Sequence, residues 1–284
     1  MEVILESIDE IASRGHRVVV IPHGYTQIGD HAFHLCGKLA SVVIPETVTT
    51  IGEEAFDACV SLAEIVFPPS VTVILRRAFR GCTSLRRVVI PEPLYFIGRD
   101  VFEYCPSLER IEVAPGNRWY CSIDGALYSK DQTVLRCVPK TVSAYVIPES
   151  VTRIEWYAFD VCASLKSVVI PKTVTEIGIG AFNGCRALES VVIPPLVATI
   201  EKDTFQSCKA LKSVVIPPSV TEIAEGAFCG CESLASVVIP ESVTKIGDGA
   251  FYDCESLVSA VLPRSVEMGY SVFDHCPKVK ITRR

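Results

Sequence analysis

Apolar residues recur along this chain in one pattern with a constant period. One copy of the pattern, LASVVIPETVTTIGEEAFDAC, begins at Leu39. Ten prolines, each following an apolar triplet, mark the same position of successive copies: Pro22, Pro45, Pro68, Pro91, Pro148, Pro171, Pro194, Pro217, Pro240 and Pro263. Consecutive prolines differ by 23 in sequence number without exception from Pro22 to Pro91, and again from Pro148 to Pro263. Such a period indicates a stack of similar structural units rather than a conventional globular core.

Each unit begins with a segment that predicts a short β-strand. Leu39, Val42 and Ile44 point to one side of an extended chain, and Pro45 ends the strand because it has no N–H to donate. Residues 53–59 (EEAFDAC) fit one short helical or 3₁₀ turn that inserts an alanine, a phenylalanine and a cysteine into the interior. Since no unit can bury its apolar side alone, we predict a repeat solenoid of about eleven coils stacked about 4.8 Å apart. Its short parallel strands would form the concave face, and its helical or 3₁₀ turns the convex side.

The repeat is interrupted once. Ile147 lies 34 positions after Val113, which is longer than the regular period, and this unit lacks the A-F-x-x-C segment. Residues 122–128 and 133–139, joined by the polar residues 129–132, predict a β-hairpin in place of the turn. We expect one repeat domain over residues 1–284, with an N-terminal amphipathic helical cap (1–15), regular repeats (16–113), an irregular repeat with the hairpin (114–147), further regular repeats (148–279) and a polar C-terminal edge (280–284).

The units resemble the BspA-like, Treponema-type leucine-rich repeats. The shared pattern, I-x-I-P-x-x-V-x-x-I-G-x-x-A-F-x-x-C-x-x-L, covers residues 16–279, and YCSIDGALYSKD (Tyr120–Asp131) is similar to the irregular YSS-x-DG-x-LY-x-KD variant of that family. The resemblance implies a leucine-rich-repeat horseshoe that binds a protein or a cell-surface ligand, is secreted or displayed on a cell surface, and has no enzymatic activity. No signal peptide or wall anchor is visible in the sequence, so this location rests on the resemblance alone.

The composition narrows the classes of function. An apolar content of 49% with a mean hydropathy of +0.36 excludes a disordered chain. A net charge of −6 without basic runs provides no electrostatic surface for nucleic acid, and the apolar runs are shorter than the roughly 18 residues that a bilayer-spanning helix needs. No nucleophile elbow, glycine-rich phosphate loop or pair of carboxylates breaks the repeat. We therefore expect no enzyme, no cofactor, no nucleic-acid partner and no membrane insertion.

Ten of the thirteen cysteines lie three residues after the repeated phenylalanine: Cys36, Cys59, Cys82, Cys105, Cys162, Cys185, Cys208, Cys231, Cys254 and Cys276. The pattern predicts a row of small, buried thiols rather than a disulfide framework. Cys121, Cys137 and Cys229 lie outside the row and are the better redox candidates. Cys121 and Cys137 flank the predicted hairpin, and whether they pair stays open.

The first repeat concentrates histidines beside a cysteine, in the sequence HAFHLC. His31, His34 and Cys36 offer zinc-binding atoms, but their spacing matches no standard zinc site, and Cys36 belongs to the buried row. Surface histidines next to a core cysteine are the better interpretation, so we predict no metal site.

Strand residues that alternate with the buried ones face outward and form two columns. One column is nearly all valine: Val20, Val43, Val66, Val89, Glu112, Val146, Val169, Val192, Val215, Val238 and Val261. The column beside it is rich in serine: Ser41, Glu64, Arg87, Arg110, Ala144, Ser167, Ser190, Ser213, Ser236 and Ser259. An exposed apolar row is typical of an interaction surface, although valine is also simply a good strand former.

The columns lose their regularity in the middle of the chain. Arg87, Arg110 and Glu112 replace serine or valine there, and aromatic residues outside the consensus lie nearby in the sequence: Tyr95, Phe96, Tyr104, Trp119, Tyr120, Trp156 and Tyr157. Arginine and aromatic residues dominate binding hot spots, although some of these rings must fill the core at the irregular unit. We predict Trp119 and Tyr120 to be partly core.

The concave-face candidates for ligand binding are Arg87, Val89, Arg110, Glu112, Val169 and Val192. The leading hypothesis is a non-enzymatic module that binds a protein or a cell-surface ligand through this face. The alternative is a structural protein that self-associates through the valine row or through its coil edges.

Overall fold

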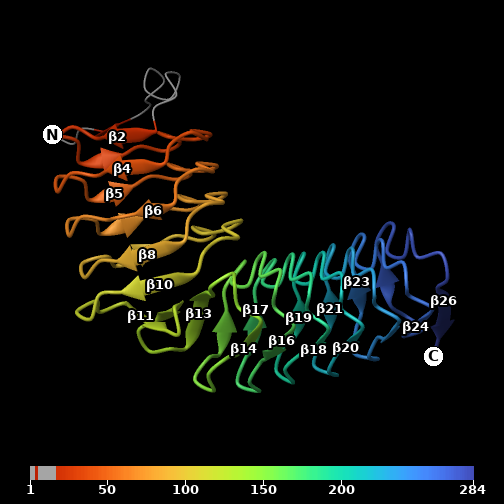
Figure 1. Cartoon of the computed structure of the whole chain (residues 1–284). Coiled ribbons are helices and arrows are strands. Elements are labelled where there is room, and N and C mark those ends of the chain that lie inside the picture. Colours follow the sequence, from red (N-terminus) through yellow and green to blue (C-terminus); the bar gives the residue numbers. More distant parts are fainter. Residues whose placement is uncertain (1–3, 6–16) are drawn as a thin grey trace. The chain divides into compact units, whose positions relative to one another are not determined.

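A computed structural model describes residues 4–5 and 17–284 of the chain, and these residues form strands and turns (Figure 1). The predicted parallel repeat solenoid is confirmed, with about twelve turns. The chain divides into two compact units. The first comprises residues 1–131 and 137–140, and the second comprises residues 132–136 and 141–284. The expectation of a single repeat domain with the boundaries given above stays a prediction.

Each coil begins with a short strand, and most of these strands pair in parallel with the equivalent strand of the next coil. In the first unit these are β2 (Val18–Val20), β4 (Ser41–Val43), β6 (Glu64–Ile65), β8 (Arg87–Ile90) and β10 (Arg110–Val113). In the second unit they are β14 (Ala144–Val146), β16 (Ser167–Val169), β18 (Ser190–Val192), β20 (Ser213–Val215), β22 (Ser236–Val238) and β24 (Ser259–Leu262). The register is that of the sequence repeat, as the pairing of Val191 with Val214 shows.

A second, shorter strand follows in each coil, where the sequence predicted only inward residues and a turn. In the first unit β1 (Ile4–Leu5), β3 (Gln27–Ile28), β5 (Thr50–Ile51), β7 (Val73–Ile74) and β9 (Phe96–Ile97) form one parallel sheet. In the second unit the equivalents are β15 (Arg153–Ile154), β17 (Glu176–Ile177), β19 (Thr199–Ile200), β21 (Glu222–Ile223), β23 (Lys245–Ile246) and β25 (Glu267–Met268). Each coil therefore carries two strands that pair with neighbouring coils.

The repeated phenylalanines form a continuous stack inside each unit. In the second unit the Phe182 ring lies 4.7 Å from Phe159 and 5.3 Å from Phe205, centroid to centroid, and the rings are nearly parallel. In the first unit Phe56 lies in the same way between Phe33 and Phe79. The valine, isoleucine, alanine, leucine and cysteine positions of the repeat surround these rings and are almost all buried. The core is thus the sum of identical layers, each of which needs a neighbour on both sides.

The predicted helical or 3₁₀ turn is not found in the described residues. The A-F-x-x-C segment is a series of turns in which Glu54 and Ala58 have φ angles of 53° and 58°. A left-handed residue at every fourth position interrupts any right-handed helix. The N–H groups of Glu54, Phe56 and Ala58 instead donate to carbonyls of the next coil at 2.8–3.0 Å. The N–H groups of Asp57 and Cys59 donate within the coil, to Glu54 O and Phe56 O, so bonds within and between coils alternate along the turn.

The irregular unit contains a β-hairpin between its first two strands. Strand β11 (Tyr120–Ile123) pairs antiparallel with β12 (Ala126–Ser129), and Asp124 and Gly125 form the loop. Both loop residues have positive φ angles, 49° and 78°, as an Asp-Gly hairpin turn requires. The predicted strand 122–128 is therefore divided by a turn at its Asp-Gly pair. The next strand, β13 (Val134–Cys137), falls within the predicted segment 133–139.

The predictions for the two ends of the chain have different outcomes. The predicted helical cap over residues 1–15 lies outside the described residues, except for Ile4–Leu5, which form strand β1. At the other end, Lys280–Arg283 form strand β26, which pairs with β24. All four residues of β26 are exposed. The polar edge expected at residues 280–284 is therefore largely a strand that extends the sheet.

Candidate binding surface

The outward strand residues form an exposed face on each unit, which we call the strand face. It consists of the valine column and the serine-rich column defined above, and its valines are half or more exposed in most coils. The exposed fractions are 51% for Val43, 70% for Val66, 37% for Val89, 57% for Val169 and 66% for Val192. The backbone beneath these side chains is already paired between coils, so the face presents side chains rather than free strand edges.

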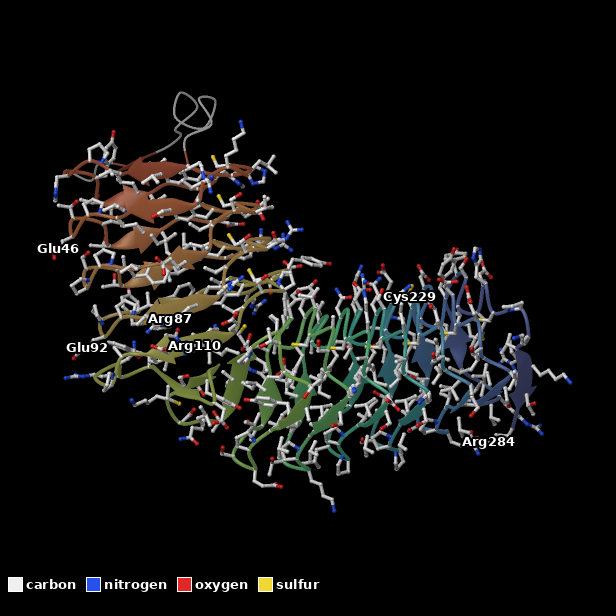
Figure 2. All side chains as sticks on the ribbon, viewed as in Figure 1. Glu46, Arg87, Glu92, Arg110, Cys229 and Arg284 are labelled. Atoms are coloured by element: carbon white, nitrogen blue, oxygen red, sulfur yellow. The ribbon has the colours of Figure 1, made fainter. Side chains whose placement is uncertain are left out.

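Charged residues interrupt this face on three neighbouring strands of the first unit: Glu64 on β6, Arg87 on β8, and Arg110 and Glu112 on β10. Arg87 lies beside Arg110 (Figure 2). Glu112 occupies the valine column next to Val89. The Arg87 guanidinium donates to both carboxylate oxygens of Glu112, at 3.1 and 2.5 Å. Arg110 Nε lies 3.1 Å from Glu112 Oε1. We call Arg87, Arg110 and Glu112 the central patch.

The central patch itself carries one net positive charge, which is offset by Glu64, the neighbour of Arg87 in the serine-rich column on β6. The hydrogen bond from Arg87 lowers the pKa of Glu112, and Arg110 acts in the same direction. The carboxylate correspondingly raises the pKa of Arg87. Two guanidinium groups thus share one carboxylate, which leaves N–H donors for an acidic group on a partner.

Four of the six candidate residues therefore lie together, and two lie elsewhere. Arg87, Val89, Arg110 and Glu112 are neighbours on β8 and β10 of the first unit. Val169 and Val192 lie in the second unit, on β16 and β18, within their own run of exposed valines.

The central aromatic residues divide into core and surface. Tyr120 is buried, and its hydroxyl accepts a hydrogen bond from Ile97 N and donates one to Tyr95 O. Trp119 is 44% exposed, and its ring lies 5.9 Å from that of Tyr95, which is also exposed. Only one of the two residues predicted to be partly core, Tyr120, is therefore a core residue.

A residue that the sequence did not single out holds the irregular unit in place. Asn117 is 1% exposed, and its Nδ2 donates to Pro91 O and Leu94 O at 2.9 Å. Its Oδ1 accepts the N–H groups of Trp119 and Tyr120. One side chain thus satisfies four backbone groups of two coils. The only available signal was an asparagine at the start of the interruption.

All thirteen cysteines lie in the described part of the chain, and each is a thiol. Nine of the ten cysteines in the row are buried as predicted, and Cys36 is partly exposed. Most thiols of the row donate to a phenylalanine carbonyl of the preceding coil, as Cys208 Sγ does to Phe182 O at 3.2 Å. Cys121 and Cys137 do not pair. Cys121 Sγ instead contacts Ser129 O on the opposite hairpin strand.

The thiols should fall into two classes of reactivity. In the native protein at about pH 8 we expect a thiol reagent to label at most Cys36, Cys121 and Cys229, which are partly exposed, while the other ten react only on unfolding. Burial raises the pKa of Cys121 and Cys229 above the ordinary 9.0, so their labelling should still accelerate above that pH. Mass spectrometry of peptides labelled with and without urea measures this. Labelling of Cys208 in the native state would contradict it.

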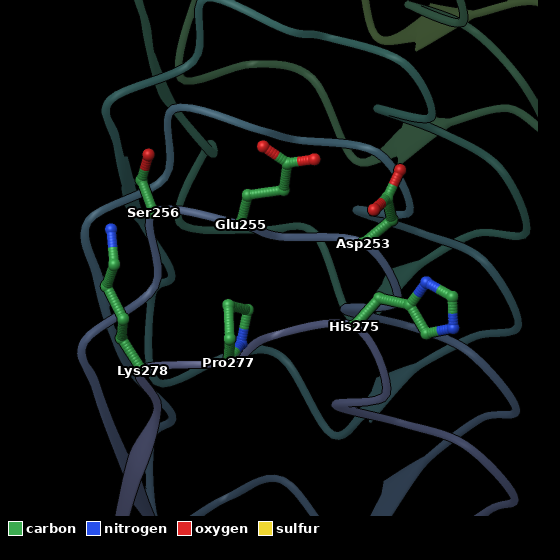
Figure 3. Close-up of a pocket in the computed structure, with 6 residues that line it drawn as sticks. All are labelled: Asp253, Glu255, Ser256, His275, Pro277 and Lys278. Carbon is green, nitrogen blue, oxygen red and sulfur yellow. The ribbon is translucent and has the colours of Figure 1, made fainter.

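A depression of about 410 Å³ lies between the last two coils (Figure 3). Its lining residues are Asp253, Glu255, Ser256, His275, Pro277 and Lys278. Asp253 and His275 lie at one end, whereas Ser256 lies at the other, so no serine–histidine pair forms (Figure 3). The His275 ring instead packs against the Tyr252 ring, at 4.7 Å. The depression provides no catalytic arrangement.

Short parallel strands in each regular coil, layered phenylalanines and a period of about 23 define a leucine-rich-repeat solenoid. Residues 15–119 and 152–280, more than half of the chain, match the family described as BspA type leucine rich repeat region (6 copies). The chain therefore belongs to the BspA-type leucine-rich repeat family. No curated protein matches the sequence. Among the described residues, no helix is long and apolar enough to cross a membrane.

Solved structures of bacterial repeat proteins are similar to the chain. A leucine-rich repeat protein from Eubacterium ventriosum is 26% identical, with a TM-score of 0.74 over 94% of this chain and 84% of its own. A leucine rich cell surface protein from Faecalibacterium prausnitzii is 27% identical, with a TM-score of 0.59 over 94% and 88%. The pneumococcal vaccine antigen PcpA, 20% identical with a TM-score of 0.68 over 94% and 68%, shares the fold.

Proposed function

We propose that this chain is a non-enzymatic binding module that contacts a protein or a cell-surface ligand through its strand face. Proteins of the leucine-rich repeat family commonly mediate protein interactions, and the repeat fold is generally non-enzymatic. The observation that carries the proposal is the central patch: two arginines and one glutamate on neighbouring strands, beside a row of exposed valines. The similar protein from Faecalibacterium prausnitzii is called a cell surface protein, which supports adhesion as the setting.

The valine row and the central patch have different roles in this proposal. Exposed valines provide apolar area, worth roughly 25 cal/mol per Å² that a partner covers, and most coils offer such area. The valine row therefore contributes to affinity but does not determine where along the solenoid a partner binds. Arg87, Arg110 and Glu112 occur in one place only, so they fix where the partner binds. Arg87 and Arg110 suit a partner that brings a carboxylate or another acidic group.

The proposal predicts that binding is lost without loss of the fold when the central patch is removed. Wild type and an Arg87→Ala, Arg110→Ala, Glu112→Ala variant are immobilised and used to capture partners from cell extracts and surface fractions. The variant should lose the specific partner and keep its thermal unfolding curve, because exposed ion pairs contribute little to stability.

A matched control is available in the same unit. Arg76 Nε donates to Glu53 Oε1 at 2.9 Å, which is also an exposed ion pair between neighbouring coils but lies away from the strand face. The Arg76→Ala, Glu53→Ala variant should capture the same partners as wild type. Identical capture by wild type and the central-patch variant would refute the role of the central patch.

One observation favours self-association as a second function. Five successive coils of the second unit each expose a valine in the same column: Val146, Val169, Val192, Val215 and Val238. A continuous apolar row of this kind can pack against its copy in another chain. Light scattering during size-exclusion chromatography measures the molar mass and so distinguishes a monomer from an oligomer. Self-association requires an oligomer that a Val89→Lys, Val169→Lys, Val192→Lys variant dissociates, and a monomeric wild type would exclude it.

A further inference from the structure

Two histidines and a carboxylate converge on the turn side of the first two coils. One nitrogen each of His31 and His34 and a carboxylate oxygen of Glu54 all lie within 4.8 Å of one another. These residues belong to the first unit, and the strand face described above does not include them. We propose that His31, His34 and Glu54 bind one divalent transition-metal ion.

The repeat itself creates this arrangement. His31 and Glu54 are one repeat apart and occupy the same column of neighbouring coils, as do His34 and Asp57. His31 Nδ1 lies 3.4 Å from Glu54 Oε2, and His34 Nδ1 lies 3.1 Å from Asp57 Oδ2. The two imidazole rings are 5.7 Å apart and nearly perpendicular. Stacking thus places metal-binding atoms of two coils close together, and both histidine rings lie at the surface.

Asp57 prepares His34 to be a ligand. Its side chain is only 8% exposed, so its position is fixed by the coil around it. A proton on His34 Nδ1 satisfies this carboxylate and leaves the Nε2 lone pair for a metal. A carboxylate behind a ligating histidine is the usual way in which proteins orient such a ligand and raise its basicity.

The charges on the following coils also leave a place for a cation. Arg77, in the same column one coil beyond Glu54, has its Nη1 3.6 Å from Glu54 Oε1, so the two carboxylate oxygens face different sides. Arg80 Nη1 lies 4.0 Å from Asp57 Oδ2, the same oxygen that His34 Nδ1 approaches. Glu54 therefore has a guanidinium group on one side. A metal ion held by the histidines supplies the positive charge on the other.

The donor set determines the class of metal. Imidazole nitrogens with one carboxylate suit Zn²⁺, Ni²⁺, Co²⁺ or Cu²⁺, whereas Mg²⁺ and Ca²⁺ require oxygen ligands. Ligand atoms about 2.1 Å from an ion lie roughly 3.4 Å apart, so the donors must close in by about 1 Å. The His31 and His34 side chains are 58% and 36% exposed and can rotate that far. Water or a donor from a partner completes the coordination.

The sequence pointed to a different third ligand. Cys36, two residues after His34, is not part of the converging group, and its place is taken by Glu54 from the next coil. Spacing along the chain cannot reveal such a site, because the ligands become neighbours only when the coils stack.

The test is a calorimetric titration of the full chain with Zn²⁺, with Mg²⁺ as a comparison. Wild type should bind one Zn²⁺ per chain, and His31→Ala, His34→Ala should weaken binding on the order of 100-fold, because one carboxylate remains. Glu54→Gln, which keeps the size of the side chain, should weaken it about 10-fold or more. His23→Ala removes an exposed imidazole from the same coil outside the cluster and should bind like wild type.

Titration with Co²⁺ identifies the ligand atoms independently. Absorption bands of nitrogen and oxygen ligation without a strong thiolate charge-transfer band are expected. Equal Zn²⁺ binding by wild type and the double histidine variant would overturn the proposal. So would thiolate bands, which would assign the ion to a cysteine, or the absence of Zn²⁺ binding by wild type. Circular dichroism of each variant verifies that the repeats remain folded, so that loss of binding is not loss of structure.

Discussion

Replacing Phe182 with alanine should lower the free energy of unfolding by about 3–5 kcal/mol. The ring is fully buried and stacked between Phe159 and Phe205 at 4.7 and 5.3 Å. Its removal leaves a cavity between two layers whose other residues are held by hydrogen bonds between coils, so the layers cannot close up. Urea unfolding followed by circular dichroism measures the loss.

The control for this prediction lies in the next strand. Val192→Ala also shortens an apolar side chain in the second unit, but Val192 is 66% exposed, so stability should change by no more than about 0.5 kcal/mol. A loss below about 1 kcal/mol for Phe182→Ala would contradict the view that the layered core holds the coils together.

Replacing Asn117 with alanine should cost about 3–5 kcal/mol, although the residue belongs to no repeat position. Its amide makes four hydrogen bonds to the backbone of two coils: to Pro91 O, Leu94 O, Trp119 N and Tyr120 N. Alanine removes a hydrogen bond from each of these groups. Pro91 O keeps the N–H of Leu94, but each buried group left unsatisfied costs about 1–3 kcal/mol unless water reaches it. Urea unfolding gives the stability, and Trp119 fluorescence reports whether the irregular unit opens first.

A neighbouring hydrogen bond provides the control for Asn117. Lys130 Nζ donates to Asn117 O at 2.7 Å from an exposed side chain. Lys130→Ala removes one bond to a single acceptor, whereas Asn117→Ala removes bonds to four backbone groups, so the loss should be smaller, about 1 kcal/mol. Similar losses for the two variants would show that Asn117 does not hold the irregular unit.

The sequence predicted the solenoid because the same few positions in each unit determine how each layer folds and packs. The proline ends the first strand, and the phenylalanine and cysteine fill the interior, so the period and the buried residues follow directly. The turn could not be predicted in the same way. Glu54 and Ala58 are ordinary helix-tolerant residues, and their left-handed conformation arises because their N–H groups bond to the next coil. Hydrogen bonds between stacked coils override the local conformational preference of these two residues.

The candidate site was predictable only in part. Arg87, Arg110 and Glu112 were visible as departures from regular columns, and strand pairing places them side by side. The bonds of Asn117 to the preceding coil and the approach of Glu54 to the two histidines were not visible, because both depend on contacts between stacked coils. Adjacent residues can also differ: Trp119, in the bend before β11, is exposed, whereas Tyr120, the first residue of β11, is buried.

The central claim is that partners contact the strand face rather than the turn side, and one comparison of affinities tests it most directly. Val89 and Leu35 are both exposed apolar residues of the first unit, but Val89 lies on the strand face and Leu35 in the turn segment. The affinity of the captured partner is measured for wild type, Val89→Lys and Leu35→Lys. Val89→Lys should weaken binding about 10-fold or more, because it buries a lysine at the contact. Leu35→Lys should bind like wild type. Weakened binding by Leu35→Lys with an unchanged Val89→Lys would contradict the account.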